Sequence, residues 1–185
     1  YFENWKSDNE YPSGTRVAAL CSTRQQLEKQ LVSAKRVIID GDSSSVLPGL
    51  FINTKAEKAD GTLALLFSGQ GSQLPDMLSD LSIIFPVVRE TFEFANTVLS
   101  GKLDKPLSDY IFPPPPVDNR MKEASMQVIT NTLIAQPALA AVEMAIYKLL
   151  LHFGIKADFA AGHSFGELTA LWAAGVFSEE TLIRL

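Results

Sequence analysis

Apolar and polar positions in the first sixty residues predict a small α/β unit. An apolar run at residues 16–20 predicts a short strand. Ser22 or Thr23 can cap a helix that follows it. The inward positions predicted for this helix are Leu27, Leu31 and Val32.

A second strand and a linker are expected next. Residues 37–39 (Val-Ile-Ile) predict the strand, and residues 40–45 predict a loop. The charged stretch 54–61 lacks apolar periodicity, which is typical of a linker. We therefore expect residues 1–60 to form one unit and residues 61–185 to begin another.

The second unit starts with a buried strand and continues with helices. Residues 62–67 are a continuous apolar run, as expected of a strand buried on both faces of a parallel sheet. Apolar residues at helical spacing predict a helix over 85–99, with inward positions Val88, Phe92, Ala95 and Leu99. A longer helix is predicted over 136–153, with Pro137 in its first turn.

Alternation of strands and helices sets the fold class. Gly154 is placed to end the long helix. Residues 155–161 predict a short strand, and the helix after it is expected to stop at Gly175. The sequence therefore predicts an α/β fold whose parallel sheet is flanked by helices.

Composition narrows the functional classes. The net charge is −5 and no basic stripe could neutralise a run of phosphates, so no nucleic-acid partner is expected. The single cysteine, Cys21, cannot form an internal disulfide, which fits the cytoplasm. One cysteine and two histidines provide no metal-ligand cluster.

Neither a membrane segment nor natural chain ends are expected. No apolar stretch reaches the length of a bilayer span, and the N-terminus lacks a signal-peptide pattern. The chain begins in a polar, aromatic segment without an initiator methionine and stops at Leu185 without a helix-stop signal. We expect both ends to lie within a longer protein.

Residues 162–166 (Gly-His-Ser-Phe-Gly) have the form Gly-x-Ser-x-Gly. A serine that attacks a carbonyl projects from a tight strand-to-helix turn, and the crowding in such a turn calls for glycine on both flanks. An apolar strand is predicted before the motif and a helix after it. Ser164 is therefore predicted to be a nucleophile; the alternative is a serine that merely caps a helix.

Residues 69–73 (Gly-Gln-Gly-Ser-Gln) follow the predicted strand of the second unit. A phosphate cradle is one interpretation, but the third glycine of a dinucleotide fingerprint and the lysine of a P-loop are missing. Alternatively, the backbone N–H of Gln70 lies beside Ser164 as an oxyanion donor, as nucleophile-elbow enzymes require. A purely structural glycine turn is the third interpretation.

Neither histidine is expected to act as the general base. His163 adjoins Ser164, but neighbours across a sharp turn point in different directions, so we expect it to line the mouth of the pocket. His152 lies late in the long helix, where it suits the C-terminal dipole. A serine hydroxyl needs a base within hydrogen-bond reach. We therefore expect that base beyond Leu185.

Three motifs occur in a familiar order. They are residues 66–73 (Leu-Phe-Ser-Gly-Gln-Gly-Ser-Gln), 136–139 (Gln-Pro-Ala-Leu) and 162–167 (Gly-His-Ser-Phe-Gly-Glu). Together they resemble malonyl-CoA:acyl-carrier-protein transacylases and the acyltransferase domains of fatty-acid and polyketide synthases. The resemblance covers about residues 62–185. The segment before it resembles a ketosynthase-to-acyltransferase linker.

A narrower resemblance points to one kind of synthase. Residues 107–116 and 166–172 look closest to the large subunit of bacterial polyunsaturated fatty acid synthases. The family implies an α/β-hydrolase-like core, of which this chain holds only part. It also implies an adjacent ketosynthase domain in the same chain.

The resemblance implies a mechanism and roles for individual residues. Ser164 takes an acyl group from an acyl-CoA, and the phosphopantetheine thiol of an acyl carrier protein removes it; no bound cofactor is implied. The backbone amides of Gln70 and Phe165 form the oxyanion hole. Gln136 lines the acyl pocket, and Phe165 helps shape it in a way that favours malonyl.

The family's general-base histidine and the arginine that binds the malonyl carboxylate fall beyond Leu185, so this chain by itself is expected to be inactive. Two other functional classes remain open. A serine hydrolase shares the Gly-x-Ser-x-Gly motif but gives no reason for residues 69–73. A non-catalytic scaffold would use the aromatic N-terminus and the linker-like first unit as its binding surface, and its function would survive the loss of Ser164.

Overall fold

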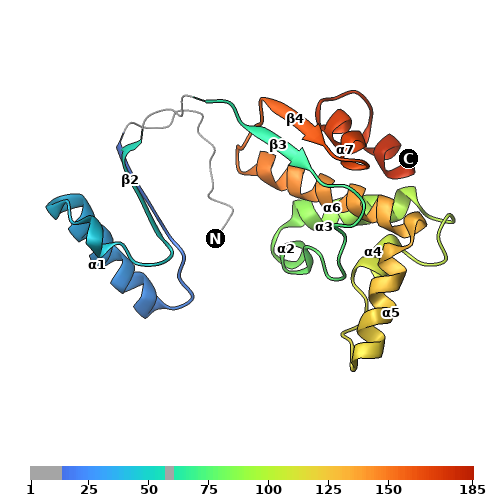
Figure 1. Cartoon of the computed structure of the whole chain (residues 1–185), viewed down its shortest axis with the longest axis horizontal. Coiled ribbons are helices and arrows are strands. Elements are labelled where there is room, and N and C mark those ends of the chain that lie inside the picture. Colours follow the sequence, from blue (N-terminus) through green and yellow to red (C-terminus); the bar gives the residue numbers. More distant parts are fainter. Residues whose placement is uncertain (1–13, 57–60) are drawn as a thin grey trace. The chain divides into compact units, whose positions relative to one another are not determined.

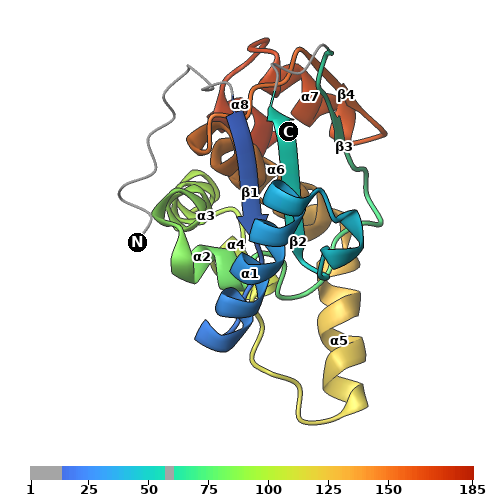
Figure 2. The same ribbon diagram turned by 90° about the vertical axis from the view of Figure 1, so that its left-hand side faces the viewer.

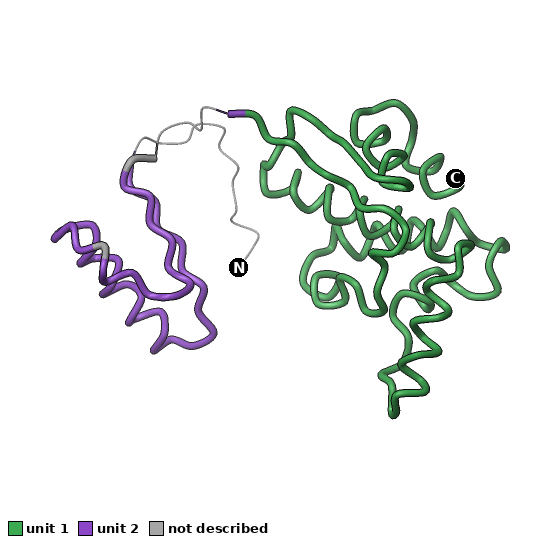
Figure 3. The backbone as a smooth tube through the Cα atoms, viewed as in Figure 1, with its two compact units in different colours: residues 1–7, 62–185 green, residues 8–61 purple. Residues whose placement is uncertain are grey.

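The computed structural model describes residues 14–56 and 61–185 of the chain. The chain divides into two compact units, with a boundary between Gly61 and Thr62 (Figure 3). We call the described residues before this boundary the N-terminal unit and those after it the C-terminal unit. The aromatic N-terminal segment and residues 57–60 of the predicted linker lie outside the described residues.

The N-terminal unit is a hairpin-like sheet with one helix between its two strands. Its elements are β1 (Gly14–Ala19), α1 (Arg24–Asp40), a 3₁₀ turn (Ser43–Ser45) and β2 (Leu50–Ala56) (Figure 1). The strands pair antiparallel, with Val17 opposite Ile52. The hydroxyl of Thr23 caps α1 by accepting a hydrogen bond from the backbone N–H of Gln26.

The second strand of this unit is not where the sequence predicted it. Residues 37–39 form the last turn of α1, because nothing breaks the helix before Gly41, which adopts the left-handed conformation with φ 68°. The second strand is β2, which takes up the first three residues of the predicted linker. Three β-branched residues were therefore a weaker signal than the glycine that ends the helix.

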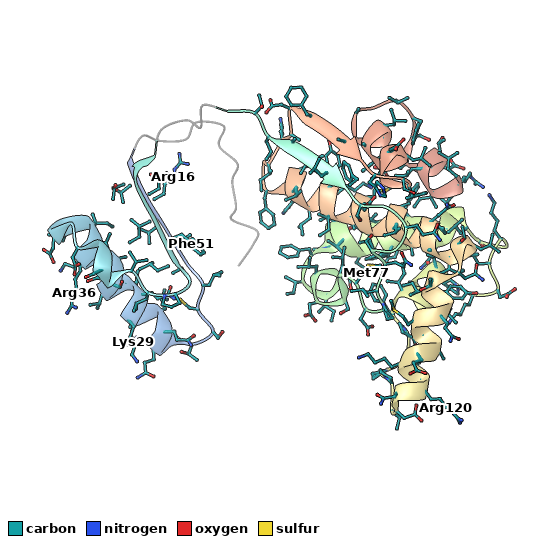
Figure 4. The ribbon with its side chains drawn as sticks, viewed as in Figure 1. Arg16, Lys29, Arg36, Phe51, Met77 and Arg120 are labelled. Carbon is teal, nitrogen blue, oxygen red and sulfur yellow. The ribbon has the colours of Figure 1, made fainter. Side chains whose placement is uncertain are left out.

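The predicted inward face of α1 is also wrong. Leu27, Leu31 and Val32 are exposed, whereas Gln30, Ser33 and Ala34 are buried. The amide of Gln30 donates to the carbonyls of Leu20 and Pro48, so burial leaves it satisfied. Side chains extending from α1 and β2, among them Lys29, Arg36 and Phe51, are visible in Figure 4.

The C-terminal unit contains two strands and seven helices among its described residues. They are β3 (Ala64–Phe67), α2 (Ser79–Ile84), α3 (Pro86–Val98), α4 (Leu107–Ile111), α5 (Asn119–Thr130), α6 (Thr132–His152), β4 (Phe159–Gly162), α7 (Gly166–Ala173) and α8 (Glu179–Arg184). Helix α5 projects from the rest of the unit in both ribbon views (Figure 1 and Figure 2). Only one of its residues, Ile129, is buried.

Helix α6 runs through the core of this unit. It begins at Thr132, capped by Asn131, so Pro137 lies in its second turn and not in the first as predicted. The helix is long and apolar enough to cross a membrane by length and composition, contrary to our expectation, but most of it is buried within the unit. Helix α3 packs against it, and the predicted inward residues Val88, Phe92, Ala95 and Leu99 are buried in the same hydrophobic core.

The parallel pair β3–β4 confirms the predicted α/β class and pairing direction. Phe67 is buried, and its ring lies 6.2 Å from that of Tyr147 on α6, which lies 5.2 Å from that of Trp172 on α7. Leu66 points to the other face and is 81% exposed. Among the described residues, β3 is therefore buried on one face, not on both as predicted.

Glycine ends two helices where the sequence predicted it. Gly154 follows α6 with φ 76°, and Gly175 follows α7 with φ 82°. In both cases the backbone N–H of the glycine and that of the following residue donate to carbonyl oxygens in the last turn of the helix. The N···O distances are 2.9 and 2.9 Å after α6, and 2.8 and 3.0 Å after α7. These stops fix where the chain leaves each helix on either side of β4.

Candidate active site

The candidate site lies where β3 and β4 end together. The two strands are parallel, with Phe67 opposite Gly162, so both predicted motifs leave the sheet at the same edge. The backbone N–H of His163 donates to the carbonyl of Phe67 at 3.1 Å. Two segments almost a hundred residues apart in sequence are thereby brought side by side (Figure 1).

Ser164 sits in a strained turn. Its φ is 56°, a left-handed conformation that is uncommon for a residue with a side chain. The turn closes at once into α7, since the N–H of Gly166 donates to the carbonyl of His163 at 3.0 Å and that of Glu167 donates to Ser164 at 3.1 Å. Ser164 is exposed, as a nucleophile at a strand-to-helix turn must be.

Three glycines are required by close packing around this serine. A Cβ on Gly162 would lie 2.0 Å from the carbonyl carbon of Gly166, and one on Gly166 would lie 2.4 Å from the carbonyl oxygen of Phe67. A Cβ on Gly69 would lie 2.9 Å from the Cβ of Ser164. The backbone of the 69–73 loop therefore touches the serine turn directly. The ordinary helix-cap interpretation of Ser164 explains none of these contacts.

Two backbone amides beside Ser164 are available to a ligand. Gln70 N–H follows the glycine that touches Ser164, and Phe165 N–H precedes the first residue of α7. Within the described residues, neither amide donates a hydrogen bond. The side chain of Phe165 is 5% exposed and belongs to the hydrophobic core.

The structure brings some of the other predicted residues to this turn and not others. The side-chain amide of Gln70 donates to Thr132 Oγ1 at 3.1 Å, and Gln136 is half-buried one helical turn further along α6. No hydrogen bond among the described residues joins Gln136 to the serine turn. His163 is exposed, and its Nδ1 would lie 3.1 Å from a Cβ on Gly69, so its ring rests against the 69–73 loop. His152, in the last turn of α6, contacts the Phe153 ring.

A buried acid that the sequence analysis did not single out lies behind the 69–73 loop. Glu143 Oε1 is 2.9 Å from Ser68 Oγ, which is 2.8 Å from Ser72 Oγ. The hydroxyl of Ser72 also lies 2.8 Å from the carbonyl oxygen of Gly69. The signal was present, because Glu143 is the only charged residue between Ala135 and Tyr147 on a core helix.

The environment of Glu143 favours its neutral form. The residue is 9% exposed, and burial raises the pKa of its carboxyl, an effect that the hydroxyls of Thr169 and Ser68 partly oppose. No charged side chain among the described residues contributes to this shift. Oε2 of Glu143 and the hydroxyl of Thr169 have no hydrogen-bond partner of standard geometry in the described part of the chain.

No cluster suited to a metal ion occurs in residues 14–56 and 61–185, where no three His, Cys, Asp or Glu side chains gather. This region offers a serine hydroxyl together with the backbone amides of Gln70 and Phe165, which donate no hydrogen bond to another described residue. Such a pair of donors can stabilise the oxyanion that forms when a carbonyl is attacked.

Comparison with known proteins agrees with this geometry. Residues 64–185 match the family described as the acyl transferase domain. The spectinabilin polyketide synthase system protein NorB of Streptomyces orinoci is 42% identical over 138 residues, which are 75% of this chain and 6% of that protein. A polyunsaturated fatty acid synthase protein of Thraustochytrium is 32% identical over 143 residues, which are 74% of this chain and 5% of that protein.

Solved structures show the same similarity. The acyltransferase domain from the second module of the salinomycin polyketide synthase gives a TM-score of 0.67 at 31% identity, covering 92% of this chain and 35% of that one. A malonyl-transacylase, solved in complex with the acyl carrier protein of a type II polyketide synthase, gives 0.56 at 37% identity, covering 67% of this chain and 36% of that one.

This chain belongs to the acyl transferase domain family. The family and the enzyme class predicted from the three ordered motifs are confirmed. The chain spans about a third of the length of these solved relatives and a few per cent of the synthases.

Proposed function

We propose that Ser164 is the nucleophile of an acyltransferase that moves an acyl group, malonyl by preference, from CoA to an acyl carrier protein. The observation that carries this proposal is the left-handed turn at Ser164, packed so closely that Gly162, Gly166 and Gly69 cannot bear a side chain. The match of this region to the acyl transferase domain family supports transfer over hydrolysis.

The geometry suits a two-step reaction. The hydroxyl of Ser164 attacks the thioester carbonyl, and the N–H groups of Gln70 and Phe165 stabilise the oxyanion. Collapse of this intermediate expels the CoA thiolate and leaves an acyl-serine. The phosphopantetheine thiol of the carrier protein then attacks this ester, and Ser164 recovers its proton.

The proton of Ser164 needs a base. No histidine or carboxylate among the described residues forms a hydrogen bond with Ser164, so we propose that the base is a histidine outside residues 61–185. We propose that the arginine that would bind the malonyl carboxylate also lies outside residues 61–185. Residues 61–185 then supply the nucleophile and the oxyanion donors.

Gln136 and His163 are proposed to line the acyl pocket. Gln136 lies one turn along α6 from Thr132, which the Gln70 side chain reaches, and the ring of His163 rests on the 69–73 loop. Phe165 contributes its amide, and its buried side chain forms part of the wall between the pocket and the core.

The molecular context is a multidomain synthase. We propose that the N-terminal unit is the linker between a ketosynthase and the acyltransferase, and that the protein works in the cytoplasm on fatty acids or polyketides, including polyunsaturated ones. Similarity to synthases of both kinds supports this. The carrier-protein complex of a relative supports the carrier as partner.

The test uses the full-length protein that carries this sequence. We expect incubation with malonyl-CoA to add the mass of one malonyl group to the site, and Ser164→Ala to abolish the adduct while leaving the fold intact. Addition of holo carrier protein should remove the group from Ser164 and place it on the carrier thiol. Release of free malonate at the same rate with and without carrier would instead identify a hydrolase, and full function of Ser164→Ala would identify a scaffold.

A further inference from the structure

Three short contacts lead from a buried carboxyl to the peptide that carries a proposed oxyanion donor. They join Glu143 Oε1 to Ser68 Oγ (2.9 Å), Ser68 Oγ to Ser72 Oγ (2.8 Å), and Ser72 Oγ to the carbonyl oxygen of Gly69 (2.8 Å). The carbonyl of Gly69 and the N–H of Gln70 belong to the same peptide group. The contacts therefore end on the carbonyl side of the peptide whose N–H is the proposed oxyanion donor.

The number of protons decides the direction of these hydrogen bonds. Three contacts need three protons, and the two serine hydroxyls supply only two. The carbonyl oxygen of Gly69 can only accept, so Ser72 must donate to it and Ser68 must donate to Ser72. If Glu143 is ionised, Ser68 donates to its carboxylate, and no proton remains for the contact between Ser68 and Ser72. All three bonds form together only when the carboxyl of Glu143 carries a proton and donates it to Ser68.

We propose that neutral Glu143 is a positioning residue, which starts a one-way hydrogen-bond chain through Ser68 and Ser72 that holds and polarises the peptide between Gly69 and Gln70. A hydrogen bond accepted by the carbonyl of a peptide makes the N–H of that peptide a stronger donor, because linked hydrogen bonds polarise one another. Glu143 thereby strengthens the bond from Gln70 to the oxyanion without touching the substrate. This inference rests on the proposed role of Gln70.

The surroundings of Glu143 agree with a neutral donor. The carboxyl is buried, and desolvation raises its pKa. An ionised carboxylate here would leave Oε2 charged and without a partner of standard geometry, and buried charges of that kind are costly. A neutral acid leaves only a carbonyl oxygen in that place.

The test compares four single variants of the full-length protein, and the double variant Glu143→Ala/Ser72→Ala, in single-turnover acylation by malonyl-CoA. Glu143→Ala removes the carboxyl at the start of the chain. Ser72→Ala removes the last hydroxyl, at an exposed position, and keeps the bond of 3.3 Å from the Ser72 backbone N–H to the Gly69 carbonyl. Glu143→Gln keeps a neutral group that can donate through its amide. Thr91→Val is the control, because Thr91 is a buried residue whose hydroxyl donates to the carbonyl of Val87 within α3.

The proposal predicts a loss of rate with little loss of binding. Glu143→Ala and Ser72→Ala should each lower the acylation rate at saturating malonyl-CoA about tenfold, less than the loss of a whole oxyanion donor, with KM changed by less than about twofold. The double variant should be no slower than the worse single variant, because both changes break one chain. Glu143→Gln should stay within about threefold of the parent. Thr91→Val should react at the parent rate.

Two results would overturn the proposal. Equal losses in Glu143→Gln and Glu143→Ala would mean that the ionised carboxylate is required, and a normal rate in Ser72→Ala would mean that the chain does not reach Gln70. An infrared difference spectrum between the parent and Glu143→Gln at neutral pH checks the protonation state, since only a neutral Glu143 contributes a carboxylic-acid carbonyl band. If the parent itself is not acylated at Ser164, the proposed function fails, and the infrared result on Glu143 still stands by itself.

Discussion

At the scale of single residues, the serine turn can form only because glycines leave room for the backbone segments that pack around it. The carbonyl of Phe67 lies where a Cβ of Gly166 would be, and the backbone of Gly166 lies where a Cβ of Gly162 would be. Backbone atoms cannot rotate away as the end of a side chain can. This close packing lets the turn hold Ser164 at a positive φ.

Gly166→Ala is therefore expected to disturb both stability and reaction. A methyl group 2.4 Å from the carbonyl oxygen of Phe67 forces β3 and α7 apart, at a cost of about 2 kcal/mol in the free energy of unfolding. Denaturant unfolding and acylation by malonyl-CoA measure the two effects. Gly61→Ala is the matched control, since a Cβ there meets nothing within 4 Å. Equal behaviour of the two variants would contradict the packing seen around Ser164.

The buried acid makes stability depend on pH. Because burial raises the pKa of Glu143 in the native state, this state holds the proton to a higher pH than the unfolded chain does. The native state then binds more protons between the two pKa values, so the free energy of unfolding falls as pH rises through that window. Glu143→Gln should flatten this fall in urea titrations that begin at the ordinary pKa of a glutamate, about 4.3, and continue to higher pH. Parallel curves for the two proteins would show that Glu143 ionises normally.

At the scale of elements, α6 organises the C-terminal unit. It is long enough to contact α3, α5, α7 and α8, and the residues on its buried face form much of the hydrophobic core. At its start Thr132 meets the side chain of Gln70, and in its middle Glu143 meets Ser68. The same helix therefore supports both the fold and the loop beside Ser164.

Two leucines on α6 test this role. Leu139 is 1% exposed, so Leu139→Ala should lower the free energy of unfolding by about 3 kcal/mol through lost burial and the cavity that remains. Leu133, on the same helix, is 77% exposed, and Leu133→Ala should change it by less than about 0.5 kcal/mol. Denaturant midpoints compare the two. A similar cost at both positions would mean that α6 does not bury the face described.

At the scale of the whole molecule, the chain holds two units with separate interiors. Ala34 and Leu50 are buried in the N-terminal unit, whereas a large cluster around α3 and α6 fills the C-terminal unit. Units with interiors of their own are expected to open separately, because local unfolding follows cooperative clusters of contacts.

Hydrogen exchange should reveal this separation. Gln30→Ala leaves the carbonyls of Leu20 and Pro48 without their donor, and it should speed exchange across α1 while residues 62–185 keep the parent rates. Gln25→Ala is the control, since Gln25 is an exposed residue on the same helix. Faster exchange spread over both units would show that they unfold as one.

The sequence by itself determined the features that depend on local backbone chemistry. Glycine after an apolar helical pattern located the stops at Gly154 and Gly175, although the stop at Gly41 was not predicted. The same reasoning located the turn at Ser164, because the spacing of its glycines follows from the crowding of a strand-to-helix turn. Three motifs in order then defined the family, confirmed over residues 64–185.

Only the tertiary structure decided which side chains are buried and what they contact. Apolar character alone predicted Leu27 and Leu31 as the inner face of α1, but Gln30 is buried because two carbonyls distant in sequence accept its hydrogen bonds. Glu143 is buried in the same way, since its partner Ser68 is 75 residues away. The burial of a polar group depends on partners that the fold brings to it, and the local sequence does not contain them.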